Sequence, residues 1–273
     1  MKVLMLFVDM LRPNRFGTIN NDIHNNEIDE LLESLGGTFY TNCFSPAPDT
    51  PRGMACFYTG LLPMHNGCDT RVKWPSKFIP KETSNIFDPF IENKYEMNFF
   101  SNPNERTGGL FPPGIENIGT HNQDYDMNGY LNSIDLSDDH LVFISIADYH
   151  WALQDWKYTR KGESVAINET RKSLDIVFNN FDKDDFDHIF IFSDHGFKFN
   201  AQFKAEQSYE FLNRDRANIF MFIRQKGDVG VNHQNKLCSI QDVSHTIYDL
   251  FGLDNHYSLL NRAERDYVVI EDH

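Results

Sequence analysis

The chain has 273 residues and a formal net charge of −15, and 40% of its residues are hydrophobic and 24% charged. This composition is that of an ordinary globular protein, and it excludes a disordered, collagen-like or low-complexity chain. The acidity disfavours a broad surface for nucleic-acid backbone, although a bound metal ion can reverse the charge locally and attract a small anion.

Short apolar runs alternate with helical patterns along the chain. Residues 3–8 are continuously apolar, which predicts a strand buried on both faces of a parallel sheet. In chain order, the sequence predicts a strand over 3–8, a helix over about 26–35, a strand over 38–44, a helix over 51–62, strands over 96–100 and 140–147, a helix over 163–181, strands over 187–193 and 218–223, and a helix over 240–251. This alternation predicts an α/β fold whose mostly parallel central sheet carries helices on both faces.

Cysteine usage and hydropathy bear on the compartment of the protein. The four cysteines are irregularly spaced and form no zinc or redox motif, so we expect reduced thiols. No apolar run reaches the length of a membrane span, and the first residues lack the cleavage site of a secretory signal. These features predict a soluble, cytoplasmic protein without a transmembrane segment.

Polar side chains directly follow three of the predicted strands. Asp9 follows the first strand, and Asp148 and His150 follow the strand at 140–147. Asp194 and His195 follow the strand at 187–193. Ligands of open α/β sheets collect beyond the carboxyl ends of the strands, and a set of carboxylates and imidazoles suits zinc or manganese better than calcium. Taken alone, Asp9 is more often a turn former or helix cap, Asp194 and His195 fit a tight turn as well, and His150 fits a half-buried structural histidine.

Thr50 stands directly before the helical pattern of 51–62. We expect Thr50 to be the N-cap of that helix and Pro51 to be its first residue. The N–H groups and the dipole of a first turn favour a tetrahedral anion at this point. A threonine hydroxyl is a poor nucleophile alone, but metal coordination activates it. Thr50 is therefore either a nucleophile or only a cap.

Segments in the right order along most of the chain resemble the sulfatase branch of the alkaline phosphatase superfamily. The segments at 8–17 and 45–67 resemble its first metal-binding loop and its nucleophile helix. Residues 192–196 (FSDHG) resemble its second metal motif, and the segments 204–223 and 241–252 resemble the parts that follow. The resemblance implies a sulfatase-like α/β fold and a metal-dependent esterase.

The nucleophile position departs from the formylglycine sulfatases of that branch. Those enzymes carry Cys or Ser in a C/S-x-P-x-R pattern, whereas the position nine residues before Thr59 holds Thr50 here. A threonine at this position is similar to the phosphodiesterases, phosphonate hydrolases and phosphoethanolamine or glycerol-phosphate transferases of the superfamily. The similarity implies one divalent ion held by Asp9, Thr50, Asp194 and His195. The expected ion is zinc or manganese, and calcium or magnesium is the alternative.

The resemblance implies a metal-dependent hydrolase or transferase of phosphodiesters, phosphomonoesters or phosphonates, in which Thr50 forms a phosphothreonine intermediate. Asp148 and His150 would hold a second metal or contact the substrate, and Arg52 and Lys204 are candidate anion-binding residues. Two alternatives stay open. One is a sulfuric-ester hydrolase that acts without the formylglycine motif, and the other is a catalytically silent binding module.

The resemblance also bears on domain organisation and partners. We expect one catalytic domain over 1–273, in which 101–132 forms an irregular cap or an insert that lines the substrate pocket. Residues 267–270 are a candidate closing strand in place of the small C-terminal sheet domain of typical sulfatases. The expected partner is a small anionic ester or a glycan or lipid head group, not a nucleic acid. The sequence leaves the oligomeric state open.

Overall fold

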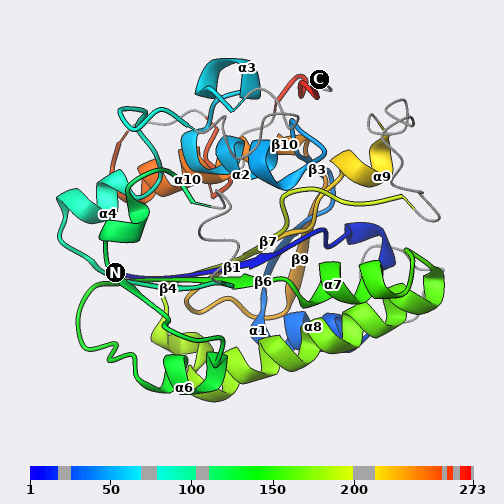
Figure 1. The fold of residues 1–273 in the computed structure, drawn as a ribbon, viewed down its shortest axis with the longest axis horizontal. Helices are drawn as coiled ribbons and strands as arrows, with labels where there is room; N and C mark the ends of the chain where they lie inside the picture. The colour runs from blue at the N-terminus through cyan, green and yellow to red at the C-terminus, as the bar shows by residue number, and fades with distance from the viewer. Residues whose placement is uncertain are drawn as a thin grey trace.

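An eight-stranded sheet runs through the middle of the molecule, in the order β5-β4-β6-β1-β7-β8-β2-β9 (Figure 1). The computed structural model describes residues 1–17, 26–68, 79–102, 111–198, 213–253, 257–260 and 265–271. The strands of the sheet are β1 Lys2–Val8, β2 Gly37–Tyr40, β4 Glu96–Phe100, β5 Thr120–His121, β6 His140–Ile146, β7 His188–Phe192, β8 Met221–Gln225 and β9 Val231–Gln234. A separate two-stranded sheet pairs β3 Cys43–Phe44 with β10 Cys238–Ser239.

Helices cover both faces of the sheet, as Figure 1 shows. The α-helices are α1 Glu27–Leu35, α2 Thr50–Thr59, α3 Pro63–Asn66, α4 Asp88–Glu92, α6 Met127–Asn132, α7 Asp148–Asp155, α8 Arg160–Asn180, α9 Arg214–Ala217 and α10 Gln241–Leu250. In the view of Figure 1, α2, α4 and α10 lie above the sheet, and α1, α6, α7 and α8 lie below it. This arrangement confirms the predicted α/β fold with helices on both faces.

Strand β1 shows why residues 3–8 are apolar without alternation. Its side chains at 3, 5 and 7 belong to the core under α2 and α10, and those at 4, 6 and 8 belong to the core under α1 and α8. Because β1 is paired in parallel with β6 on one side and β7 on the other, both of its faces are buried. Strands β5, β4, β6, β1 and β7 are all parallel, so their carboxyl ends meet at one edge of the sheet.

Several expectations about individual elements need correction. The strand predicted over 38–44 is split into β2 and β3, which belong to different sheets. The strand predicted over 218–223 runs from Met221 to Gln225 and is antiparallel to β7. Residues 265–271 contain no strand, so the closing strand expected at 267–270 is absent there. The segment 148–155, which carried no helix in the prediction, forms α7.

The expected insert at 101–132 falls partly outside the described residues. Its described part, 111–132, adds the edge strand β5 beside β4 and the helix α6. Phe111 and Ile115 are buried in the core under β4. This part of the segment therefore completes the sheet as well as reaching the edge where the carboxyl ends of the strands meet.

The cysteine side chains lie inside the fold. All four cysteines are free and buried, and Cys43 and Cys238 are register partners across β3 and β10. Burial raises the pKa of the Cys43 and Cys56 thiols, which disfavours the reactive thiolate form. Among the described helices, none has both the length and the apolar composition needed to cross a bilayer.

Candidate active site

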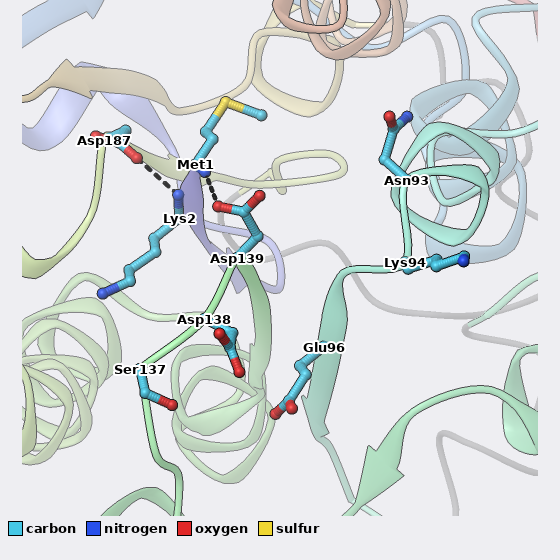
Figure 2. A pocket seen from close by; sticks show the side chains of 9 residues that line it. All are labelled: Met1, Lys2, Asn93, Lys94, Glu96, Ser137, Asp138, Asp139 and Asp187. Atoms are coloured by element: carbon cyan, nitrogen blue, oxygen red, sulfur yellow. Dashed lines mark hydrogen bonds and ion pairs between the residues drawn. The ribbon is translucent and has the colours of Figure 1, made fainter.

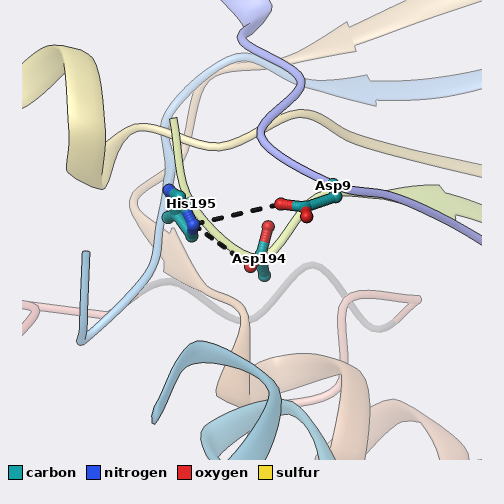
Figure 3. Close-up of side chains that lie close together, drawn as sticks. All are labelled: Asp9, Asp194 and His195. Atoms are coloured by element: carbon teal, nitrogen blue, oxygen red, sulfur yellow. Dashed lines mark ion pairs between the residues drawn. The ribbon is translucent and has the colours of Figure 1, made fainter. Parts of the chain in front are cut away.

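Asp9, Asp194 and His195 converge at the carboxyl ends of the two central parallel strands. Asp9 directly follows β1, and Asp194 and His195 follow β7, its neighbour in the sheet. One donor atom of each residue lies within 4.8 Å of the other two. His195 Nε2 lies 3.4 Å from Asp194 Oδ2 and 4.0 Å from Asp9 Oδ1 (Figure 3). The structure thus brings together three of the residues that the sequence analysis expected at one metal site.

The carboxylates of this group have the properties of metal ligands. Asp9 is 6% exposed and Asp194 is fully buried. Asp9 Oδ1 and Asp194 Oδ2 accept no hydrogen bond from any described residue. A buried carboxylate oxygen without a partner is costly, so native structures rarely keep two of them together. A divalent cation between them would remove this cost, and the donor set of two carboxylates and one imidazole fits zinc or manganese.

The second oxygen of each carboxylate is held in place. Asp9 Oδ2 lies 2.6 Å from His150 Nδ1, and Asp194 Oδ1 accepts a hydrogen bond from the Met10 backbone N–H at 3.2 Å. Met10 has a φ of +67°, a left-handed conformation that a non-glycine residue rarely adopts. The loop after β1 therefore stores backbone strain at the residue whose N–H bonds to Asp194.

His195 is oriented by its own backbone segment. Its Nδ1 lies 2.7 Å from the Gly196 carbonyl oxygen, so the Nδ1–H group donates to that oxygen, and Nε2 faces Asp9 and Asp194. A Cβ at Gly196 would lie 2.1 Å from the Asp215 carbonyl oxygen. Only glycine fits this close approach, which accounts for the glycine in the Asp194-His195-Gly196 motif.

The two carboxylates have opposite pKa shifts. Burial alone would raise the pKa of Asp9, but the His150 and His195 imidazoles together lower it below its usual value. Burial and the neighbouring Asp9 charge raise the pKa of Asp194 to about 6, although His195 and the Thr50 hydroxyl oppose the rise. The group therefore resists holding two negative charges unless a cation is bound.

Asp194→Asn is expected to stabilise the metal-free protein at neutral pH. A carboxyl whose pKa rises from 3.8 to about 6 on folding weakens the folded state above pH 6, and the penalty fades as the pH falls towards 4. At pH 7 the substitution should raise the free energy of unfolding by about 3 kcal/mol, since each unit of pKa shift is worth about 1.4 kcal/mol. Urea denaturation with a chelator at pH 7 and pH 4.5 measures this gain. A loss of stability at pH 7, or an equal gain at both pH values, would contradict the assignment.

Helix α2 brings Thr50 to the same group. The Thr50 Oγ1 atom lies 3.3 Å from His195 Nε2. A Cβ at Gly53, one turn along α2, would lie 2.8 Å from the Asp194 carbonyl oxygen, so this glycine lets the helix pack directly against the end of β7. The structure thus places the proposed nucleophile beside the expected metal ligands.

The prediction that Thr50 caps α2 is wrong. Asp49 is the N-cap, its carboxylate accepts the Arg52 backbone N–H at 3.3 Å, and Thr50 is the first helical residue. Asp is at least as good an N-cap as Thr, and it stands one residue earlier. Because the Asp49 carboxylate already occupies the first turn, the helix N-terminus offers less to a bound anion than the sequence suggested.

The structure describes one of the two expected anion-binding residues. Arg52 is fully buried, and its Nε donates to Asp49 Oδ2 at 2.8 Å. This ion pair balances the charge of the N-cap beside Thr50. Lys204 lies outside the described residues.

Asp148 and His150 point in different directions. His150 contacts Asp9, and its side chain is 31% exposed. Asp148 instead accepts a hydrogen bond from the Ser173 hydroxyl of α8 at 3.0 Å. The described residues thus assemble one group of candidate metal ligands, with His150 at its edge and Asp148 apart from it.

Sequence reasoning missed several residues that build the site. Arg12 is buried beside it, donates from Nη2 to Glu163 Oε1 at 2.8 Å, and stacks over the Phe197 ring at 4.0 Å. These contacts join the loop after β1 to the loop after Gly196 and to α8. Asp49 was readable as a cap from its residue type, whereas nothing in the sequence signals the left-handed Met10 or the long-range Arg12–Glu163 pair.

A surface pocket at the opposite edge of the sheet has different chemistry (Figure 2). Its lining residues are Met1, Lys2, Asn93, Lys94, Glu96, Ser137, Asp138, Asp139 and Asp187. The terminal amino group pairs with Asp139, and the Lys2 backbone N–H donates to Asp187 at 2.7 Å. Since it contains no imidazole and lies at the amino ends of β1 and β6, the pocket is separate from the Asp9 group.

The comparisons with known proteins rest on structure. The sequence matches no protein-family model and no curated protein. A candidate sulfatase from Bacteroides thetaiotaomicron has a TM-score of 0.73 at 12% identity, covering 97% of this chain and 75% of that one. The phosphonate monoester hydrolase of Agrobacterium radiobacter has a TM-score of 0.66 at 13% identity, covering 97% and 78%. Ps i-CgsB, solved with a neocarrahexaose, has a TM-score of 0.64 at 14% identity, covering 97% and 77%.

These neighbours have the architecture that the sequence resemblance implied. Their similarity extends over 97% of this chain. The chain therefore has the fold that these sulfatase and phosphonate monoester hydrolase structures share.

Proposed function

We propose that the protein is a metal-dependent hydrolase or transferase of phosphate esters, with Thr50 as its nucleophile. One observation carries the proposal: the Thr50 hydroxyl lies 3.3 Å from His195 Nε2, beside two buried carboxylate oxygens without hydrogen-bond partners among the described residues. Asp9, Asp194, His195 and Thr50 would together hold one divalent ion. The phosphonate monoester hydrolase among the structural neighbours supports this class of chemistry.

The proposed reaction has two steps at the Thr50 oxygen. A divalent ion held by these residues would lower the pKa of the hydroxyl and offset charge on the non-bridging oxygens of the ester. Thr50 Oγ1 bonds to phosphorus while the bond from phosphorus to the leaving oxygen breaks. The hydroxyl proton passes to solvent, and the leaving oxygen takes up a proton from solvent. Water or an acceptor alcohol then breaks the Oγ1–phosphorus bond and restores the threonine.

The neighbouring residues hold this arrangement in place. His150 fixes Asp9 through its Oδ2 atom, which directs Oδ1 towards His195. Arg52 compensates the Asp49 carboxylate at the start of α2, so that the negative charge of the cap does not repel an anionic ester. Asp148 lies apart from the ligand group, which favours one metal ion over two.

The substrate class is testable with a panel of small esters. Metal-loaded protein is expected to hydrolyse phosphodiesters or phosphonates with a kcat/KM at least tenfold above that for matched sulfates, because no cysteine or serine stands at the nucleophile position for maturation to formylglycine. The panel pairs phenyl phosphonate and phosphate esters with phenyl and alkyl sulfates. Faster turnover of sulfates would favour the sulfatase alternative. Stoichiometric metal without turnover of any ester would favour a silent binding module.

A further inference from the structure

Two exposed aromatic side chains lie against each other at the edge of the sheet that carries the candidate active site. Tyr125 is 41% exposed and Trp151 is 38% exposed, and their ring centroids are 5.9 Å apart at 53°. The buried ring of Phe100 stacks on Tyr125 at 5.2 Å and 28°. The two exposed rings therefore form a small angled apolar surface that Phe100 supports from below Tyr125, and we call this surface the Tyr125–Trp151 platform.

Helix α7 links the platform to the proposed site. Trp151 directly follows His150 in α7, so one helix turn contacts Asp9 through His150 and Tyr125 through Trp151. Phe100 ends β4, which pairs with β6, and β6 pairs with β1, the strand that leads to Asp9. A substrate whose ester group lies at Thr50 can therefore extend along this edge onto the two rings.

The chemistry of the platform selects a neutral ring with one apolar face. Exposed aromatic rings in mutual contact are a feature of ligand sites, because aromatic faces bind flat apolar surfaces and lose solvent when covered. Gln123 and Asp124, next to Tyr125 in the chain, are exposed and offer hydrogen bonds to hydroxyl groups. A second anionic group is disfavoured here by Asp124 and by the net charge of −15. A pyranose ring combines the C–H face and the hydroxyl edge that this surface matches.

We propose that the Tyr125–Trp151 platform is a subsite for a neutral sugar ring in the leaving group of the ester. The inference rests on the proposed function, because it assigns the leaving group of that same reaction. It adds two specificity-determining residues that take no part in metal binding or bond breaking.

A binding experiment tests the subsite without requiring turnover. Saturation-transfer NMR with methyl β-D-glucoside, methyl β-D-galactoside and methyl N-acetyl-β-D-glucosaminide should show contact through the apolar ring face of at least one of them. Trp151→Ala and Tyr125→Ala should weaken that binding about 3- to 10-fold. Trp151→Phe and Tyr125→Phe, which keep an aromatic ring, should retain most of it.

Trp156 supplies a matched control next to α7. It follows the last residue of the helix, is 39% exposed, and its ring contacts the Lys161 ammonium at 4.8 Å. Trp156→Ala should leave glycoside binding unchanged. Absence of binding to the intact protein, or equal binding by the Trp151→Ala and Trp156→Ala variants, would overturn the subsite. Preferential binding of phenol or adenosine would overturn its assignment to sugars.

Kinetics separate the subsite from the proposed function. With a sugar phosphodiester, Trp151→Ala should raise KM about 3- to 10-fold, and with dimethyl phosphate it should change neither KM nor kcat. Glycoside binding that depends on Trp151, combined with no turnover of any ester, would support the subsite and contradict the proposed function. Turnover of the sugar ester with an unchanged KM in Trp151→Ala would overturn the subsite and leave the proposed function standing.

Discussion

Thr50→Ala is expected to lower kcat by roughly 10³-fold or more, because it removes the atom that bonds to phosphorus. The fold should persist, since the Thr50 side chain is half-buried and Asp49, not Thr50, caps α2. Steady-state kinetics on the best substrate of the ester panel measure the loss. Thr50→Ser, which restores a hydroxyl at the same position, should recover part of the activity.

Thr59 provides the control for this substitution. It ends the same helix, and its hydroxyl donates to the Ala55 carbonyl oxygen at 2.7 Å, at the end of α2 that faces away from His195. Thr59→Ala should cost about 1 kcal/mol of stability and leave kcat unchanged. Comparable activity in Thr50→Ala and the unaltered protein would exclude threonine as the nucleophile.

Removal of bound metal is expected to abolish turnover and to be reversed by zinc or manganese. Protein from which a chelator has removed the metal should bind one divalent ion per chain, as measured by calorimetry and elemental analysis. Substitution of a residue that only hydrogen-bonds to a metal ligand typically weakens metal binding roughly 10- to 100-fold. Asp9→Asn should weaken it more than that, because it removes a direct ligand. Calcium and magnesium should restore less activity, since they prefer all-oxygen ligand sets to one that includes an imidazole.

Asp148→Asn is the matched control for the ligand substitutions. Asp148 is a carboxylate just beyond the end of the neighbouring strand β6, but it bonds to Ser173 and lies outside the Asp9 group. Unchanged metal stoichiometry and affinity are expected in this variant. If Asp148→Asn binds one metal ion fewer than the unaltered protein, two ions bind. Turnover by the unaltered protein in the presence of a chelator would contradict metal dependence.

The parts of the fold that the sequence predicts are those fixed by burial. Residues 3–8 are apolar at every position because β1 is covered on both faces, and a six-residue apolar run of this kind rarely occurs in an exposed segment. Strand order and direction depend on distant partners. Nothing within residues 218–223 shows that β8 pairs with β7 in the antiparallel sense, or that the segment 38–44 splits between two sheets.

The sequence predicts which site residues lie close together where their places at the ends of neighbouring strands decide it. Asp9 and the pair Asp194 and His195 meet because they lie just beyond the carboxyl ends of adjacent parallel strands. Asp148 and His150 could not be separated in advance, because the segment after β6 was not recognised as a helix. Residues two apart on a helix face different sides, so His150 reaches Asp9 while Asp148 reaches α8.

The most direct test of the central claim is mass spectrometry of the metal-loaded enzyme, quenched during turnover of a phosphate ester and digested to peptides. Covalent catalysis by Thr50 predicts one phosphoryl group on the peptide that contains Thr50, and no such modification in Thr50→Ala. A phosphoryl group on another side chain, or turnover by Thr50→Ala at the rate of the unaltered enzyme, would contradict it.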